Sequence, residues 1–257
     1  MNLAAFMAML GRDGRVARRN FLPLLLQNLV QPMLFVFIFG RVMTTSGMMP
    51  EAYKSLLLPG IIAISMLLSG LQAVAFPMIA DFQFSREIED RLLAPMEIEW
   101  VAIEKVVAGG IQALIAGGVV IPLAWLILGS GVQISFAQPF ELVALAVLVA
   151  VLAAAIGLTL GCSLGQAQIG IMFSLIIGPM IFFGCTYYPW SALASFPILQ
   201  KAVLINPFVY ASEGFRSALA PQFPHLPGYL VFGGLLVFNA VFLSLGLRQF
   251  RRKAIGY

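Results

Sequence analysis

Apolar residues are gathered into six long runs, and most charged residues lie in the segments between these runs. A helix needs about 20 apolar residues to cross the hydrocarbon core of a membrane, because each residue advances it by about 1.5 Å. All six runs approach or exceed this length. We therefore predict six transmembrane helices, over residues 21–39, 56–80, 106–128, 142–162, 167–185 and 228–247.

The composition supports this interpretation. Apolar residues make up 61% of the 257 residues and charged residues only 10%, whereas a soluble domain has about 45–50% and about 25% respectively. These values exclude a soluble protein, and the number of apolar runs excludes a protein with a single membrane anchor. We predict an all-α integral membrane protein in which residues 1–257 form one transmembrane domain.

Lys and Arg residues predict which side of the membrane each connection faces, because cytoplasmic loops retain positive charge. With the amino terminus inside, 11 of the 15 basic residues are cytoplasmic, so both termini are expected in the cytoplasm. This asymmetry explains the net charge of +4, and we expect no nucleic acid partner. The cytoplasmic basic residues are Arg12, Arg15, Arg18, Arg19, Arg86, Arg91, Lys105, Arg248, Arg251, Arg252 and Lys253, and the outer ones are Arg41, Lys54, Lys201 and Arg216.

Residues 81–100, on the cytoplasmic side, have the pattern of a short amphipathic helix. Arg86 is spaced i,i+4 from Asp90, as Glu87 is from Arg91, so oppositely charged pairs share one face. An apolar ridge on another face would give a soluble partner a surface to pack against. The alternative is a solvated loop whose charges only keep it in water.

Residues 186–227, on the outer side, are too apolar for a free loop and too often interrupted for another crossing. Pro189, Pro197 and Pro207 divide the segment. Short helices that enter the outer leaflet and return fit this pattern, provided that protein or a water-filled cavity surrounds the breaks. An ordinary extracellular loop is the alternative.

Polar side chains inside a span are costly and are therefore candidates for function. Gln27, Asn28 and Gln31 lie within about one helical turn. They either hydrogen-bond a neighbouring helix or line a path for the polar part of a substrate. The outer aromatic residues, Phe136, Phe140, Tyr187, Tyr188 and Trp190, either anchor the protein at the interface or contact an amphiphilic substrate, and we include Tyr187 and Tyr188 in the candidate path.

Two further pairs of charged residues lie outside the spans, one in the segment 186–227 and one at the inner start of the third span. Glu213 and Arg216 would meet on a helix, either to lower the cost of burying both or to gate the outer face, and we group Asn206 with them as a candidate outer gate. Glu104 and Lys105 lie where long side chains can reach the headgroup region. We predict that these two are interfacial.

Small residues recur every four positions in two spans, which lets helix backbones approach closely. Such stripes form the contacts of a helix bundle or of a dimer. They are Gly109, Ala113 and Gly117 in the third span, and Ala153, Gly157, Gly161 and Gly165 in the fourth.

The sequence offers little for catalysis or for metal binding. It has no GxxxxGK[ST] phosphate-binding loop, so we expect this chain to bind no ATP and no other cofactor. His225 is the only histidine, which disfavours a metal site or a catalytic triad. Cys162 and Cys185 lie in apolar runs and are expected to be buried small hydrophobes.

Three stretches, taken with the predicted topology, resemble the ABC type-2 transporter permeases. They are LLPGI at 57–61, EDRLLAP at 89–95 and INPFVYASEGFRSAL at 205–219. The resemblance covers nearly the whole chain. It implies the permease subunit of an ABC exporter, placed in the bacterial cytoplasmic (inner) membrane. The substrate it implies is amphiphilic: a drug, a glycolipid, a lipo-oligosaccharide or a polysaccharide.

The resemblance also implies partners and roles. The permease would pair with a second copy of itself and with two copies of a cytosolic ATPase, which would hold ATP and Mg²⁺. Residues 1–20 would form a cytoplasmic amphipathic arm, 81–100 the coupling helix and 186–227 a pair of re-entrant helices. The residues assigned to ATPase coupling are Arg86, Glu87, Glu89, Asp90 and Arg91.

Other classes of membrane protein fit less well. An ion-gradient-driven secondary transporter or channel is the alternative, and it would be favoured by charged residues deep within spans. The centres of the six predicted spans contain none. A membrane-embedded enzyme would need a nucleophile, a metal cluster or an acid–base pair, and none is evident in the sequence.

Overall fold

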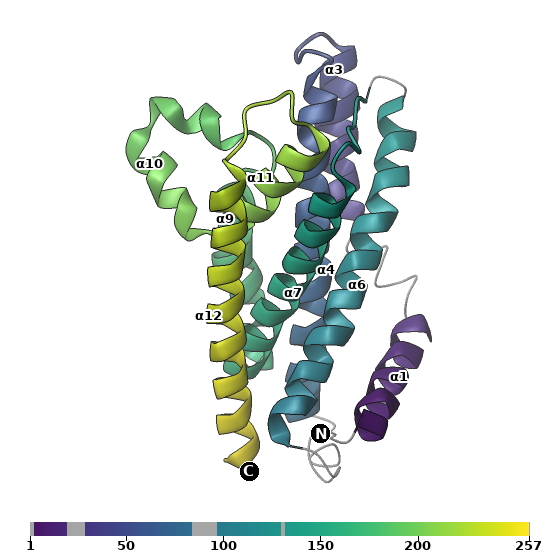
Figure 1. Ribbon diagram of the computed structural model, residues 1–257, viewed down its shortest axis with the longest axis vertical. Helices are drawn as coiled ribbons and strands as arrows, with labels where there is room; N and C mark the ends of the chain where they lie inside the picture. The colour runs from purple at the N-terminus through teal and green to yellow at the C-terminus, as the bar shows by residue number, and fades with distance from the viewer. Residues whose placement is uncertain (1–2, 20–28, 84–96, 130–131, 257) are drawn as a thin grey trace.

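The computed structural model of the chain describes residues 3–19, 29–83, 97–129 and 132–256, and helices dominate these ranges. Four helices are long and apolar enough to cross a membrane: α4 (Tyr53–Gln83), α6 (Ile98–Leu128), α7 (Pro139–Ser163) and α12 (Gly228–Ile255). They correspond to the second, third, fourth and sixth predicted spans. Figure 1 shows them running side by side as an elongated bundle.

The first and fifth predicted spans correspond to shorter apolar helices in the described residues. The helix Leu29–Thr45 includes a π-helical stretch and ends in α3 (Met43–Thr45), while residues 21–28 lie outside the described ranges. The helix Ile169–Phe182 starts with α8 (Ile169–Ile171), passes through a π-helical stretch and ends with α9 (Gly178–Phe182). It stops short of the predicted end at residue 185, because the chain turns at Phe183 and reaches positive φ at Cys185.

Helix α4 forms the centre of the bundle. Of its most apolar 18-residue window, 89% is buried, against 61% for α7, 33% for α6 and 22% for α12. It packs against α6, α7 and α11 (Pro207–Leu219). Helices α6 and α12 therefore present most of their apolar surface outward, where lipid or another subunit can cover it.

The small-residue stripes bring these helices together, as predicted. A side chain at Gly109 or Gly117 would run into Val74 or Met66 of α4. A Cβ added to Gly157 would lie 2.5 Å from the backbone carbonyl oxygen of Leu71. The stripes on α6 and α7 thus hold α4 between them.

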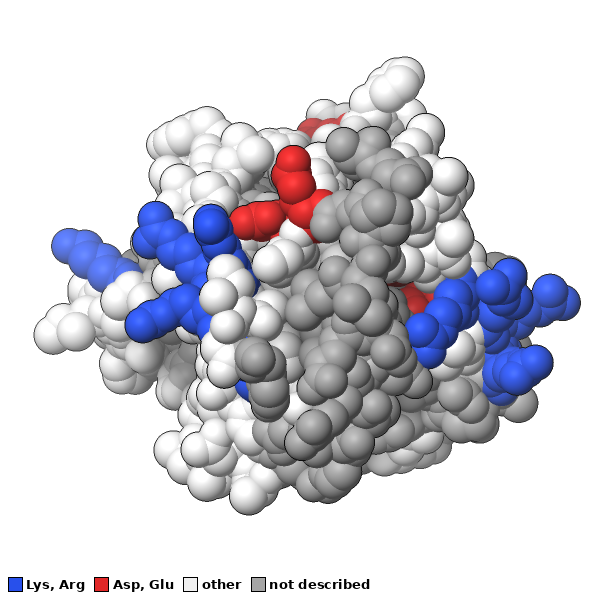
Figure 2. Space-filling model, turned by 90° about the horizontal axis from the view of Figure 1, so that it is seen from below, with Lys and Arg blue, Asp and Glu red and all other residues white. Residues whose placement is uncertain are grey.

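Basic residues lie at both ends of the bundle, but most gather at the lower end of Figure 1. Seen from below, their side chains form two groups, under α1 (Leu3–Arg19) and under the end of α12 (Figure 2). There Arg251 lies 3.5 Å from Glu99, and the Lys253 ammonium lies 4.7 Å from the centre of the Phe82 ring. The last turns of α12 therefore contact the end of α4 and the start of α6.

Glu104 and Lys105 differ from the prediction that their side chains reach toward the headgroups. Glu104 is fully buried and Lys105 is 5% exposed. Helix α6 begins at Ile98, two turns before the predicted span, so both residues lie inside the helix. The Lys105 ammonium contacts carboxylates of α1 and α4 instead of extending toward the membrane surface.

Candidate functional site

The segment between α9 and α12, called the outer segment below, lies beside the part of the bundle that is far from the chain termini (Figure 1). It contains a 3₁₀ turn at Trp190–Ser195, α10 (Pro197–Ala202), a second 3₁₀ turn at Val203–Ile205, and α11. Every residue of α11 except Tyr210 is buried. Helix α11 contacts α4, α7 and α12, so this part of the segment is packed into the protein and is not a free loop.

Asn206 starts α11 and holds it against α9. Its Oδ1 accepts a hydrogen bond from the backbone N–H of Phe208 at 3.0 Å, which is an N-cap interaction. Its Nδ2 donates to the carbonyl oxygen of Met180 at 2.7 Å. Pro207 follows at the first helical position, where its missing N–H costs nothing.

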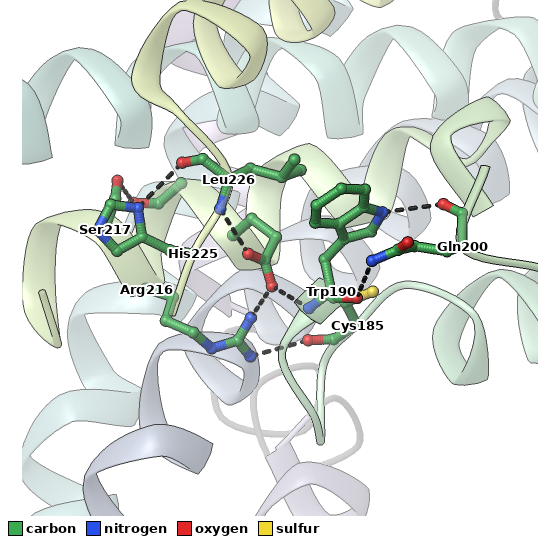
Figure 3. A network of polar contacts seen from close by, with 9 residues as sticks. Cys185, Trp190, Gln200, Arg216, Ser217, His225 and Leu226 are labelled. Carbon is green, nitrogen blue, oxygen red and sulfur yellow. Dashed lines mark hydrogen bonds and ion pairs between the residues drawn. The ribbon is translucent and has the colours of Figure 1, made fainter. Parts of the chain in front are cut away.

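Glu213 and Arg216 form a fully buried ion pair on α11, which confirms that they meet. Glu213 Oε1 also accepts a hydrogen bond from the backbone N–H of Trp190 at 2.9 Å. Its Oε2 accepts one from the backbone N–H of Leu226 at 2.9 Å. Arg216 Nη2 donates to the carbonyl oxygen of Cys185 at 2.8 Å. Figure 3 shows these bonds converging on the pair.

These bonds join four parts of the chain around one pair of charges. Hereafter we call Glu213, Arg216 and their three backbone partners the outer clamp. Burying a charge is costly unless it is paired and hydrogen-bonded. Here the two charges are paired, and both carboxylate oxygens and both terminal guanidinium nitrogens have partners, whereas Arg216 Nε has none among the described residues. The outer clamp therefore fixes the start and the end of the outer segment to α11. It supports the expectation that pairing lowers the cost of burial, while the gate role stays a prediction.

The outer segment also touches α4 directly. A Cβ at Gly60 would collide with the backbone of Thr186, so the two backbones are in close contact only because residue 60 is glycine. Two turns earlier in α4 lies Tyr53, whose hydroxyl donates to the carbonyl oxygen of Tyr187 at 2.8 Å. The end of α4 that begins at Tyr53 and the start of the outer segment are thus joined.

Of the candidate path residues, Tyr187 lies against the helix Leu29–Thr45. Its ring centre is 4.7 Å from that of Phe35 and 6.2 Å from that of Phe39. Gln31 is exposed and lies one turn before Phe35, so this polar residue and the two rings share one face. The i,i+4 spacing of residues 31, 35 and 39 is the sequence signal for this shared face. The predicted substrate path includes Gln31 but neither Phe35 nor Phe39.

Tyr188 is less enclosed than Tyr187. Its hydroxyl donates to the carbonyl oxygen of Phe182 at 2.9 Å. Burial raises the pKa of both Tyr187 and Tyr188 above the ordinary tyrosine value, so both hydroxyls stay neutral. Both can therefore offer hydrogen bonds and an aromatic surface, but no charge.

Several candidate residues cannot be placed. Gln27 and Asn28 lie outside the described residues, and so do the coupling candidates, which are Arg86, Glu87, Glu89, Asp90 and Arg91. Cys162 and Cys185 are both buried, as expected, and both are free thiols. No group of three or more His, Cys, Asp or Glu residues suited to a metal ion occurs within the described part of the chain.

A comparison with protein families agrees with this architecture. The model of the ABC-2 type transporter family matches residues 4–220, a range that holds nearly all of α1, the helices from there to α11, and both Glu213 and Arg216 of the outer clamp. No curated protein matches the sequence. Membrane subunits of this family pair with an ABC ATPase subunit. The chain belongs to the ABC-2 type transporter family and is a multi-pass membrane permease.

Proposed function

We propose that this permease is the membrane subunit of an ATP-driven exporter of amphiphilic substrates. The substrate would be a drug, a glycolipid, a lipo-oligosaccharide or a polysaccharide, taken from the cytoplasm or the inner leaflet. The working unit is a permease homodimer with two cytosolic ATPase subunits, which bind ATP and Mg²⁺. It resides in the bacterial cytoplasmic membrane with six spans, both termini inside and re-entrant helices on the outer side.

One observation carries this proposal: α4 links the two functional ends of the molecule. Its last residue, Gln83, leads into the connection that holds the predicted coupling residues. Its outer end contacts the outer segment at Gly60 and Tyr53. A displacement of the inner end by an ATPase would therefore reach the outer segment through one continuous, buried helix.

The same geometry suggests how substrate would pass. The outer clamp makes the outer segment a compact body, and rigid-body motion of two permeases would open and close the path between them. The face formed by Gln31, Phe35 and Tyr187 offers both polar and aromatic contacts, which suits a substrate that has both characters. ATP hydrolysis on the partner supplies the energy.

The test is charge reversal in the predicted coupling helix. Vesicles that contain the permease and its ATPase should lose most ATP-dependent transport when Glu89→Arg and Arg91→Glu are combined, while the complex still assembles. Lys201→Glu is the control, because Lys201 is exposed on α10, away from the predicted coupling helix, and should tolerate reversal. Unchanged transport in the double variant would contradict the docking role. Transport that stops when ion gradients are dissipated, with ATP present, would favour a secondary transporter.

A further inference from the structure

Lys105 is a buried cation that contacts two carboxylates from different helices. Its Nζ lies 2.7 Å from Oδ2 of Asp13 on α1 and 3.5 Å from Oδ2 of Asp81 on α4. The side chains of Lys105, Asp81 and Asp13 are 6%, 10% and 15% exposed. Ion pairs this well enclosed are screened much less than surface pairs. The contact therefore joins α1, α4 and α6 at one point.

Helix α1 lies on the surface of the bundle and also contacts α6 through apolar residues. None of its residues is buried, although Phe6 packs edge-on against Trp100 at 6.3 Å between ring centres. Farther along α6, a cavity of about 420 Å³ lies between the two helices and is lined by residues that include Leu10, Ala17 and Ile111. Apolar packing between α1 and α6 is therefore incomplete, and the Asp13–Lys105 bond adds a well-enclosed polar contact between the two helices.

The contact lies where a movement of the α4–α6 connection would be transmitted to α1. Asp81 lies in the last turn of α4, and Lys105 lies in the second turn of α6. These two turns flank the connection that contains the predicted coupling residues. A force applied to that connection would displace both turns, and α1 is attached to both through Lys105.

We propose that Lys105 is a positioning residue that ties the amino-terminal helix α1 to the two ends of the α4–α6 connection. Helix α1 then moves together with the connection when the ATPase acts. The attachment of α1 stands on the geometry alone, whereas its part in transport rests on the proposed function. The experiment therefore measures the two separately.

The attachment is tested by limited trypsin digestion of the full-length protein in lipid nanodiscs. Asp13→Asn removes the carboxylate of α1 but leaves Lys105 its contact with Asp81, so the bundle should still fold. Cleavage at the Arg15–Val16 bond should be at least about fivefold faster than in the wild type, because local opening becomes easier. That bond is chosen because the substitution alters the cleavage site at Arg12 itself.

Two variants serve as comparisons. Arg251→Gln removes a cation from an exposed pair at the same end of the molecule and should leave the cleavage rate unchanged. Lys105→Arg keeps a cation between the two carboxylates and should also keep α1 protected. No acceleration in Asp13→Asn, or equal acceleration in Arg251→Gln, would overturn the attachment.

The role in transport is tested with the ATPase present. Asp13→Asn should lower the amount of substrate moved per ATP hydrolysed severalfold, and Lys105→Arg should preserve it. If Asp13→Asn released α1 but left the amount of substrate moved per ATP unchanged, the proposed part of α1 in transport would be overturned. If the wild type showed no ATP-dependent transport, the proposed function would fail, but the digestion result would still decide the attachment.

Discussion

Glu213 and Arg216 have no contact with water, so each depends on the other and on the backbone groups around them. Removing one partner of such a pair leaves an uncompensated buried charge, which typically costs about 3–5 kcal/mol. Removing both avoids that penalty.

We therefore expect Glu213→Gln and Arg216→Met each to lower the free energy of unfolding by about 3–5 kcal/mol, and the double variant to lose less than the sum. Unfolding in mixed detergent micelles measures all three. Ser217→Ala is the control on the same helix, since its hydroxyl donates to the carbonyl of Gly214 and should be worth about 1 kcal/mol. Additive losses would contradict a direct interaction between the two charges.

The sequence was sufficient to predict this pair but not its setting. The i,i+3 spacing places the two side chains on one face of any helix. Their backbone partners lie 13, 23 and 31 residues away along the chain, in turns for which the sequence has no periodic signal. Lys105 shows the same limit, because its partner Asp13 is 92 residues distant.

The lengths of the apolar runs predict the positions of the long helices well. The prediction 142–162 corresponds to α7 at Pro139–Ser163. Larger errors arose at helix ends that carry charged residues. Helix α6 begins at Ile98 and contains Lys105, whose ammonium has a partly buried partner in Asp13, and α12 continues through a basic turn to Ile255. The length of an apolar run predicts the part of a helix that can cross a membrane. It does not predict the residue at which the helix ends, because the backbone hydrogen bonds continue into charged turns.

Close packing of α7 on α4 gives a prediction for Gly157. Gly157→Ala would normally favour a helix by up to about 1 kcal/mol, but here the added Cβ meets the Leu71 carbonyl oxygen. We expect a net loss of about 1–3 kcal/mol in the free energy of unfolding. Gly118→Ala in α6 is the control, because no atom lies near its added Cβ, and it should be neutral or stabilising. A stabilised Gly157→Ala variant would contradict the packing.

Across the length of the bundle, the charge distribution predicts orientation. Met48, 73% exposed near α3, and Arg251, at the end of α12, lie at opposite ends. In a background without the two native cysteines, Met48→Cys in intact cells should react with a membrane-impermeant maleimide. Arg251→Cys should react only after the cells are opened. The reverse pattern would show that the termini are outside, contrary to the excess of basic residues around them.

The side chains of the outer clamp bind neighbouring segments through backbone groups only. Glu213 accepts from two amide N–H groups and Arg216 donates to a carbonyl oxygen, so the identities of Cys185, Trp190 and Leu226 do not enter these bonds. A substitution at one of these positions would leave its bond to the outer clamp intact wherever the turn keeps its shape. Glu213 and Arg216 can therefore keep the segment in place while the side chains at its three anchor points change, provided that the backbone keeps its path.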